Sequence, residues 1–395
     1  MGEWKSFQVG EIGKVITGKT PKTSISDNYG GYIPFLTPSD DMSVKYVRKT
    51  AKTLTEKGLS EVKNAILPAN SVCVSCIGSD LGKVVITTRP TVTNQQINSI
   101  VVDEARFDIS FVYYAMRILG KKLNFISKTS TAVPIVNKSS FSSYEIECPS
   151  LKKQKQIAAV LSVLDAKIEC NRMINDNLQQ QAQSYFQELF VDNADPEWTT
   201  GTICDLGAVV GGSTPSKAKP EYYTESGIAW ITPKDLSINK SKFVSHGEND
   251  ITELGLKNSS AAIMPEGTVL FSSRAPIGYI AIAAGEVTTN QGFKSVVPKP
   301  EIGTPFVYFF LKNTLPVIEG MASGSTFKEV SGSTMKNVPA VIPDAETLAK
   351  FSDFCAPIFA QQRILEEQNQ SLATLRDNLL PKLMSGEIDV SAVQL

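Results

Sequence analysis

The nine residues GKVITGKTP at Gly13–Pro21 return as GAVVGGSTP at Gly207–Pro215, an offset of 194 residues. Further matches continue at offsets of 194 to 196: Glu3-Trp4 with Glu197-Trp198, Thr37-Pro38 with Thr232-Pro233, Thr93-Asn94-Gln95 with Thr289-Asn290-Gln291, and Phe111-Val112-Tyr113 with Phe306-Val307-Tyr308. Solenoid repeats are far shorter, at ~20–50 residues. The sequence therefore predicts a duplicated domain, and a duplicated domain can form a pseudo-dimer suited to a two-fold ligand such as duplex DNA.

Composition limits the class of protein. A chain of 395 residues with 42% hydrophobic and 20% charged residues is typical of a globular protein with several domains. It contains no apolar run of ~18 residues and no signal peptide, and its six cysteines show no disulfide framework, which favours a reducing cytoplasm. The net charge of −1 means that a DNA-binding role requires local basic patches or basic partners.

Each copy divides into a module and a long helix. Short strand-like segments separated by Gly, Pro and Asn predict α+β modules over 4–148 and 198–343. The expected domains are 1–149 for the first module, 150–192 for a central helix, 193–343 for the second module, and 344–395 for a distal helix with the C-terminal tail. The expected fold is α+β, with two duplicated modules separated by two long antiparallel coiled-coil helices in a pseudo-two-fold arrangement.

The two helices are predicted from a heptad seam that keeps its register through the duplication. A helix of about 35–40 residues with a narrow apolar stripe is less typical of a core helix than of a coiled coil. Pro381 is expected to end or kink the second helix near Leu380. The expected interface residues are Ile157, Leu161, Leu164, Asn175 and Leu178 on the first helix and Leu365, Asn369, Leu372, Leu379 and Leu383 on the second.

Two motifs that suggest chemistry are better explained by structure. Gly13–Thr20 matches the P-loop pattern, but Pro21 follows at once and the second copy lacks the lysine, so a nucleotide site is not expected. Cys73 and Cys76 would face opposite sides of a strand, without the further ligands that zinc requires. Because His246 is the only histidine, catalysis by histidine is also disfavoured, and no metal site or enzyme is predicted.

The Thr-Asn-Gln triplet is identical in both copies, which favours a structural role over reading of adenine edges. Base-reading residues are instead expected where the copies differ, in 39–52 against 234–246 and in 78–83 against 274–279. Arg274 is a candidate for reading guanine. Any one of the candidate phosphate contacts could also be an ordinary surface residue or part of a turn. The candidates are Thr20, Lys22, Lys45, Arg48, Lys49, Thr214, Lys217, Lys219, Lys234, Lys240 and Lys242.

The chain resembles the specificity subunit of type I restriction–modification systems. The resemblance is carried by Thr17–Pro21, Ile231–Asp235, Thr289–Phe293, Gln154–Glu169 and, most specifically, Leu375–Ile388, which together extend over almost the whole chain. It implies two target recognition domains, each reading half of a split DNA target through the major groove. It also implies that the helices act as a spacer and dock two modification subunits.

In such a complex the partners would supply the chemistry. The modification subunits would bring S-adenosylmethionine and adenine methyltransferase activity, and restriction subunits would add ATP-driven translocation and cleavage. This chain is accordingly expected to bind no cofactor, to catalyse no reaction itself and to contact no membrane. Two alternatives remain open: a type IIB specificity subunit, and a scaffold that carries two modules for ligands other than DNA on a coiled-coil stalk.

Overall fold

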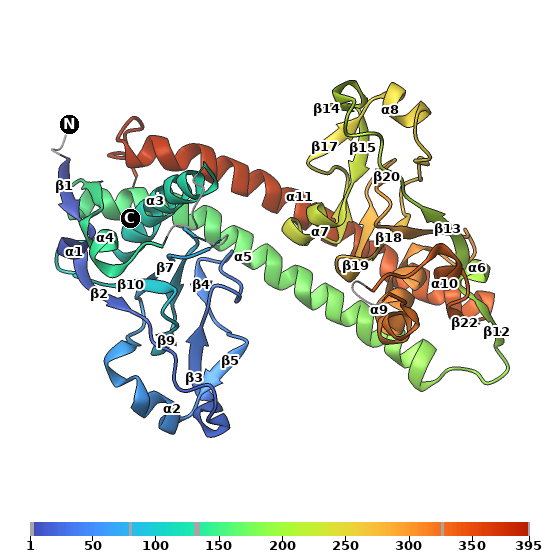
Figure 1. Ribbon diagram of the computed structural model, residues 1–395, viewed down its shortest axis with the longest axis horizontal. Coiled ribbons are helices and arrows are strands. Elements are labelled where there is room, and N and C mark those ends of the chain that lie inside the picture. The colour runs from blue at the N-terminus through green and yellow to red at the C-terminus, as the bar shows by residue number, and fades with distance from the viewer. Residues whose placement is uncertain (1–3, 79–80, 130–134, 325–327, 394–395) are drawn as a thin grey trace. The chain divides into compact units, whose positions relative to one another are not determined.

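The computed structural model describes residues 4–78, 81–129, 135–324 and 328–393. Met1–Glu3, Ser79 and Asp80, which belong to segments discussed above, lie outside these ranges. The chain forms two compact units, one of Met1–Cys170 with Asn369–Leu395 and the other of Asn171–Gln368 (Figure 1). Each unit therefore contains one module and part of both long helices.

The first module is built from three sheets and four helices. The five-stranded sheet has the order β2 (Gly13–Thr17), β10 (Ile97–Val102), β7 (Val72–Ser75), β8 (Val84–Thr87) and β4 (Tyr46–Val47). The four-stranded sheet has the order β5 (Lys52–Leu54), β3 (Tyr29–Leu36), β9 (Thr91–Thr93) and β6 (Ile66–Leu67), and β1 (Lys5–Gln8) pairs with β11 (Glu145–Cys148). The helices are α1 (Val9–Ile12), α2 (Glu56–Glu61), α3 (Ile109–Thr129) and α4 (Lys138–Ser143).

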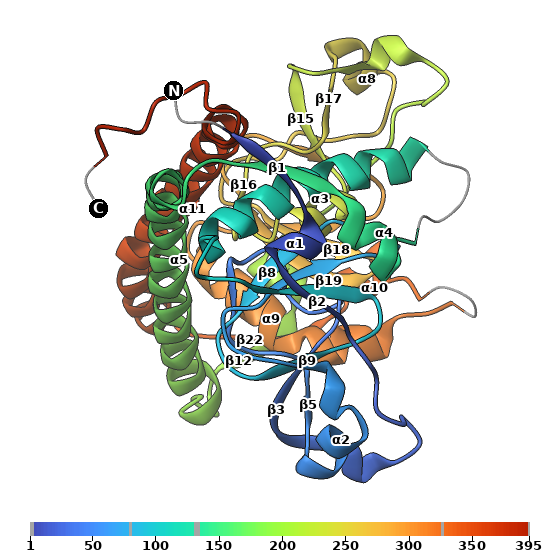
Figure 2. The same cartoon turned by 90° about the vertical axis from the view of Figure 1, so that its left-hand side faces the viewer.

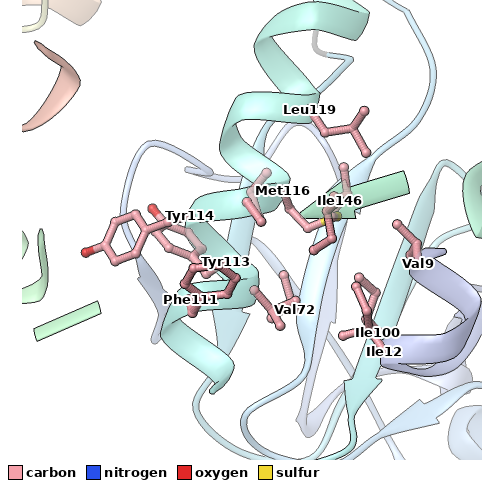
Figure 3. Close-up of a cluster of buried hydrophobic side chains, with 14 of the residues drawn as sticks. Val9, Ile12, Val72, Ile100, Phe111, Tyr113, Tyr114, Met116, Leu119 and Ile146 are labelled. Atoms are coloured by element: carbon pink, nitrogen blue, oxygen red, sulfur yellow. The ribbon is translucent and has the colours of Figure 1, made fainter. Parts of the chain in front are cut away.

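The main core of this module lies between α3 and the five-stranded sheet. Figure 3 shows Phe111 and Met116 of α3 beside Val72 of β7 and Ile100 of β10, all of which are fully buried. A separate cluster fills the other face of the sheet, and it contains Cys73. The expectation that Cys73 and Cys76 face opposite sides is confirmed, because Cys76 belongs to the main core.

The second module repeats the order of the five-stranded sheet and of the two-stranded pair, whereas the equivalent of β6 is only an isolated bridge between Met264 and Val287. Its five-stranded sheet has the order β13 (Gly207–Gly211), β21 (Lys294–Pro298), β18 (Val269–Ser273), β19 (Ile277–Ala283) and β16 (Phe243–Val244). The four-stranded sheet has the order β14 (Tyr223–Thr224), β17 (Asn249–Ile251), β15 (Ile228–Ile231) and β20 (Thr288–Thr289), and β12 (Thr199–Thr202) pairs with β22 (Pro339–Ile342). The helices are α6 (Ile203–Leu206), α7 (Pro233–Ile238), α8 (Glu253–Lys257), α9 (Thr304–Met321) and α10 (Gly332–Lys336).

The mixed sheets and the duplication confirm the predicted fold class. The same strand pairs are parallel in both modules: β4 with β8 and β16 with β19 at the sheet edge, and β3 with β9 and β15 with β20 in the smaller sheet. The other described strand pairs of these sheets are antiparallel.

The long helices α5 (Leu151–Gln187) and α11 (Ala345–Met384) run antiparallel within each unit, where they lie side by side (Figure 2). In the first unit Asn369 Nδ2 donates to Ile168 O at 3.3 Å, and Leu383 shares a core with Ile157. In the second unit Asn175 Nδ2 donates to Glu366 Oε1 at 3.2 Å. The predicted antiparallel arrangement is therefore confirmed.

The predicted seam residues differ in burial. Leu164 and Leu372 are half-buried, as are the two seam asparagines and Leu178 and Leu379, whereas Ile157, Leu161, Leu365 and Leu383 are buried. The polar seam residues bond across the helix pair, as expected for side chains that set the register of a coiled coil.

Pro381, which is expected from the sequence to end or kink the second helix, does not end it. Helix α11 continues to Met384, and Ser385 N still donates to Pro381 O at 3.0 Å. A proline removes one backbone donor, which costs one hydrogen bond. Leu380, Leu383 and Met384 are buried, so packing of the last turn outweighs that loss.

Among the described residues, no helix combines the length and apolar character that crossing a membrane requires.

Candidate nucleic-acid interface

The two loop motifs that recur in the sequence lie against each other in both modules. Thr20 Oγ1 donates to Gln95 Oε1 at 2.6 Å, and Thr214 Oγ1 forms the matching hydrogen bond with Gln291. A Cβ on Gly18 would lie 2.1 Å from the carbonyl oxygen of Asn94, so only glycine allows this approach. Because the threonine hydroxyls already donate within the protein, they retain only acceptor capacity, which does not suit a phosphate oxygen.

The Thr-Pro-x-Asp motif closes a loop in each module. Asp40 accepts hydrogen bonds from Thr37 N and Ala51 N, both at 2.7 Å, and so joins the two ends of the segment 37–51. Asp235 accepts from Thr232 N at 2.7 Å and Glu248 N at 2.8 Å. The shared aspartate is therefore structural, and the segment that differs between the copies projects from a common base.

A cavity of about 410 Å³ opens beside this loop in the first module. Residues from both of the segments in which the copies differ line it, together with the end of the Thr-Asn-Gln turn. The lining residues are Thr37, Pro38, Ser39, Asp40, Ala51, Lys52, Ile77, Gly78, Asn94 and Gln96. The fold thus brings together two stretches that are about 40 residues apart in the chain but share the property of differing between modules.

One lining position changes from apolar to cationic between the modules. Ile77 and Arg274 both lie two residues after the recurrent strand serines Ser75 and Ser272. Arg274 is half-buried, and its Nη1 lies 3.4 Å from Glu329 Oε2. Arg274, which is paired with one carboxylate, keeps further donors for a ligand, because guanidinium carries five N–H groups.

Two further lining positions also differ. Lys52 begins β5, whereas Asn249 begins the equivalent strand β17. Gln96 follows the Thr-Asn-Gln triplet in the first module, and Gly292 follows it in the second. The asparagine of each triplet is used locally: Asn94 Oδ1 accepts from Gln96 N at 3.1 Å, and Asn290 Oδ1 accepts from Gly292 N at 2.9 Å. The sequence pattern singles out neither Lys52 nor Gln96 individually, although Lys52 closes one of the divergent segments.

Most of the predicted phosphate contacts lie on the surface. Lys22, Lys49, Lys217, Lys219 and Lys240 are exposed. Three other basic residues have carboxylate neighbours: Arg48 Nε is 3.9 Å from Glu169, Lys234 Nζ is 2.5 Å from Glu248, and Arg274 is paired as described. Exposed ion pairs contribute little to stability, about 0–1 kcal/mol, so these side chains remain exchangeable for a phosphate.

Lys45 and Lys242 do not suit phosphate contact, and here the expectation from sequence is corrected. Their exposed fractions are only 9% and 7%. Lys45 Nζ donates to Ser162 Oγ on α5 at 2.7 Å, and Lys242 Nζ donates to Gln362 Oε1 on α11 at 2.5 Å. A solvated lysine was the reasonable alternative from residue type alone, but both side chains instead point at a long helix.

The burial of Lys242 predicts a pH-dependent stability. Burial, reinforced by Lys312, lowers the pKa of Lys242 to about 7, although Glu366 and Cys355 act in the opposite direction. In the unfolded chain its pKa is ~10.4, so between these values the unfolded state binds more protons and stability rises with pH. We expect the unfolding free energy of the wild type minus that of Lys242→Met to increase by up to ~1.4 kcal/mol per pH unit above pH ~7.

Urea denaturation between pH 6 and 9.5 measures this difference. Lys240→Met is the control, because Lys240 is exposed and should show a difference from wild type that does not vary with pH. A pH-independent difference for Lys242→Met would mean that the buried lysine does not titrate in this range.

Comparison with known proteins places the chain in a family. A model described as "Type I restriction modification DNA specificity domain" matches residues 1–180 and again residues 196–375. The chain is 39% identical over 194 residues to the type I restriction enzyme MjaIX specificity subunit of Methanocaldococcus jannaschii, covering 47% of this chain and 45% of that protein. The match thus extends over about half the length of that relative.

Two other similarities cover nearly the entire chain. Identity is 22% with the type I restriction enzyme HindI specificity subunit of Haemophilus influenzae, over 98% of this chain and 100% of that protein. The S subunit of the type I restriction–modification system from M. genitalium has a similar fold, with a TM-score of 0.56, 18% identity and coverage of 97% and 96% of the two chains. With the family model matching both copies, the chain belongs to the family of type I restriction–modification DNA specificity subunits.

Proposed function

We propose that each module binds one half of a bipartite duplex DNA target, and that the rim of the cavity in the first module and the equivalent surface of the second module read its bases. The observation that carries this proposal is the meeting of the divergent segments around the cavity, on a base formed by the motifs that both modules share. A protein that recognises two different half-sites requires a supporting structure that is shared by both modules and a binding surface that differs between them.

The complex that uses this reader is also part of the proposal. The division into 1–149, 150–192, 193–343 and 344–395 would then be functional, with two recognition domains and two helical segments that dock two modification subunits. Restriction subunits would join the same assembly. The chain itself would supply specificity, while methyl transfer and cleavage would take place on its partners.

Phosphate contacts would come from the exposed basic residues. Lys22 and Lys49 in the first module and Lys217, Lys219, Lys234 and Lys240 in the second remain candidates, with Arg48 beside them. Each phosphate contact releases counterions, so the logarithm of the affinity should fall linearly with the logarithm of the salt concentration, with a slope of about −0.9 per contact.

The test is twofold. The chain in complex with its modification subunits should bind duplex DNA with a steep dependence on salt, and methylome sequencing of cells that carry the complex should reveal a bipartite motif. A chain that binds no duplex at low salt, or whose binding ignores salt, would instead support the ligand scaffold. Cleavage of the DNA on both sides of the motif by a fused partner would point to the type IIB arrangement.

Arg274→Ala is expected to weaken DNA binding by roughly 1–3 kcal/mol, or about 5- to 150-fold, and to relax specificity at one base pair of one half-site. The reason is that arginine forms a bidentate pair with guanine O6 and N7. Fluorescence anisotropy with duplexes substituted at each position measures both effects.

Glu329→Gln is the matched control, because it breaks the same 3.4 Å ion pair and leaves the arginine in place. It should bind DNA as tightly as the wild type or more tightly. Equal losses in both variants would show that the ion pair supports the fold of the module and that Arg274 does not contact a base.

A further inference from the structure

A buried lysine connects the edge of the first module's main sheet to a long helix. Lys45 immediately precedes the edge strand β4, and its carbonyl oxygen accepts from Ile86 N of β8 at 2.8 Å. From this fixed backbone the side chain extends to α5, where Nζ donates to Ser162 Oγ at 2.7 Å, and Nζ also donates to Ser110 Oγ of α3 at 3.0 Å. The residue therefore bonds the sheet through its backbone and the helix through its side chain.

The second module has an equivalent lysine that connects its edge strand to a long helix. Lys242 immediately precedes the edge strand β16, and its carbonyl oxygen accepts from Ile282 N of β19 at 2.7 Å. Its Nζ donates to Gln362 of α11, and the amides of Lys242 and Phe243 donate to the carboxylate of Glu366 at 2.9 and 3.0 Å. Here the helix binds both the side chain and the backbone of the segment that enters the edge strand.

Aromatic rings surround both ammonium groups. Lys45 Nζ lies 4.8 Å from the ring centre of Tyr114 and 5.5 Å from that of Tyr113. Lys242 Nζ lies 4.0 Å from the ring centre of Phe359 and 4.8 Å from that of Tyr308. A cation within about 6 Å of a ring face is attracted to it, and the enclosure leaves few other orientations for the chain of methylenes.

The surroundings of the lysine have changed between the copies while the lysine has stayed. In the first unit Tyr114 donates through its hydroxyl to Asp165 of α5 at 2.5 Å. In the second unit the equivalent positions are Phe309 and Phe359, whose ring centres are 6.1 Å apart. A polar pair has been exchanged for an apolar pair, and both arrangements enclose an ammonium group that bonds the helix.

We propose that Lys45 and Lys242 are positioning residues that do not touch DNA. Each holds its module in one fixed position on the helix pair, which we call the seat of the module. Burying a cation is costly, and hydrophobic replacements of buried ionic groups are often neutral or stabilising. A buried polar group can instead select one arrangement, because its hydrogen bonds are satisfied there and lost in any shifted one. For DNA readout this consequence rests on the proposed function, since a loose seat would misplace the reading surface.

The seat is tested first without DNA, by hydrogen exchange on the whole chain. Lys242→Met keeps most of the apolar stem of the side chain but is one atom shorter and lacks the amino group, so it removes the bond to Gln362. We expect exchange at the amides of Lys242 and Phe243 to rise at least 10-fold, whereas Lys240→Met, at an exposed position, should leave them unchanged. Unchanged protection in Lys242→Met would overturn the proposal.

The first module provides a milder variant that keeps the lysine. Ser162→Ala removes only the acceptor on α5, and Lys45→Met removes the donor. Both should increase exchange at Ile86, whose amide bonds the lysine carbonyl, by at least 3-fold, while Lys49→Met should not. Exchange that rises equally in the Lys49 control would show that the segment is loose for other reasons and would contradict the seat.

DNA binding then separates a positioning lysine from a phosphate contact. Lys242→Met should weaken binding about 10-fold with an unchanged salt slope, whereas loss of a phosphate contact reduces the slope by about 0.9. A reduced slope, or unchanged affinity, would overturn the proposal. If the wild-type complex binds no duplex at all, the proposed function fails, and the hydrogen-exchange results still decide whether the lysines seat the modules.

Discussion

Arg376→Ala is expected to lose roughly 3 kcal/mol of unfolding free energy, because it leaves a buried carboxylate without its cation. Arg376 Nη1 lies 2.8 Å from Asp165 Oδ1, and the two side chains are only 13% and 9% exposed. Asp165 also accepts from the hydroxyl of Tyr114. Lys45 lies close enough to Asp165 to compensate part of the charge, which places the expected loss at the lower end of the range for broken buried pairs.

The duplication supplies a rescue for this loss. At the equivalent positions the second unit has Phe309, Phe359 and the fully buried Ala182, which form part of one hydrophobic core. The triple variant Tyr114→Phe, Asp165→Phe, Arg376→Ala copies that set into the first unit. It should recover most of the lost stability, because a buried ionic group can be replaced by packed apolar residues without net loss.

Urea denaturation of the single and triple variants measures both effects. Lys382→Ala serves as the control on the same helix, since it breaks an exposed 3.6 Å pair with Glu387 and should cost less than about 1 kcal/mol. If Arg376→Ala cost no more than Lys382→Ala, the buried pair would contribute no more than a surface pair. A triple variant as unstable as Arg376→Ala would mean that the two units do not pack equivalently at these positions.

Exchange of residues 4–148 for the corresponding segment of another specificity subunit is expected to replace one half of the recognised motif completely. The other half and the spacer between the halves should persist. The physical reason is that the two modules have separate cores, with no buried residue in common, and mutational effects at sites without shared partners are independent. Methylome sequencing of cells that carry the chimera with its partners gives the motif directly.

The design of the chimera follows from the proposed seat of the module. The incoming segment should place a lysine where Lys45 lies, because α5 presents Ser162 to it. A second chimera with methionine at that position is the matched comparison, and its complex with the modification subunits should methylate the same motif less efficiently. A change in both halves of the motif would show that the modules read DNA jointly.

The architecture could be predicted from the amino-acid pattern alone. Heptad periodicity over ten positions predicted α5 and α11, because few structures other than a pair of long helices can bury an apolar stripe of that length and period. Their observed lengths are 37 and 40 residues. The duplication predicted two modules of one fold, because two segments with the same pattern of apolar, glycine and proline positions have the same structural requirements. It also separated the invariant Thr-Asn-Gln turn from the segments that differ.

The roles of the individual polar residues depend on contacts that the sequence does not reveal. Lys45 and Lys242 cannot be told from Lys49 and Lys240 by residue type or by neighbouring sequence. Their burial depends on α5 and α11, whose contacting residues lie 117 and 120 positions away. Pro381 likewise predicts an end or a kink of the helix, yet α11 continues to Met384, where the buried Leu383 packs its last turn. Local sequence pattern determines which elements form, whereas burial depends on contacts between segments distant in the chain. Burial is the reason that Lys45 and Lys242 bond the long helices instead of lying on the surface.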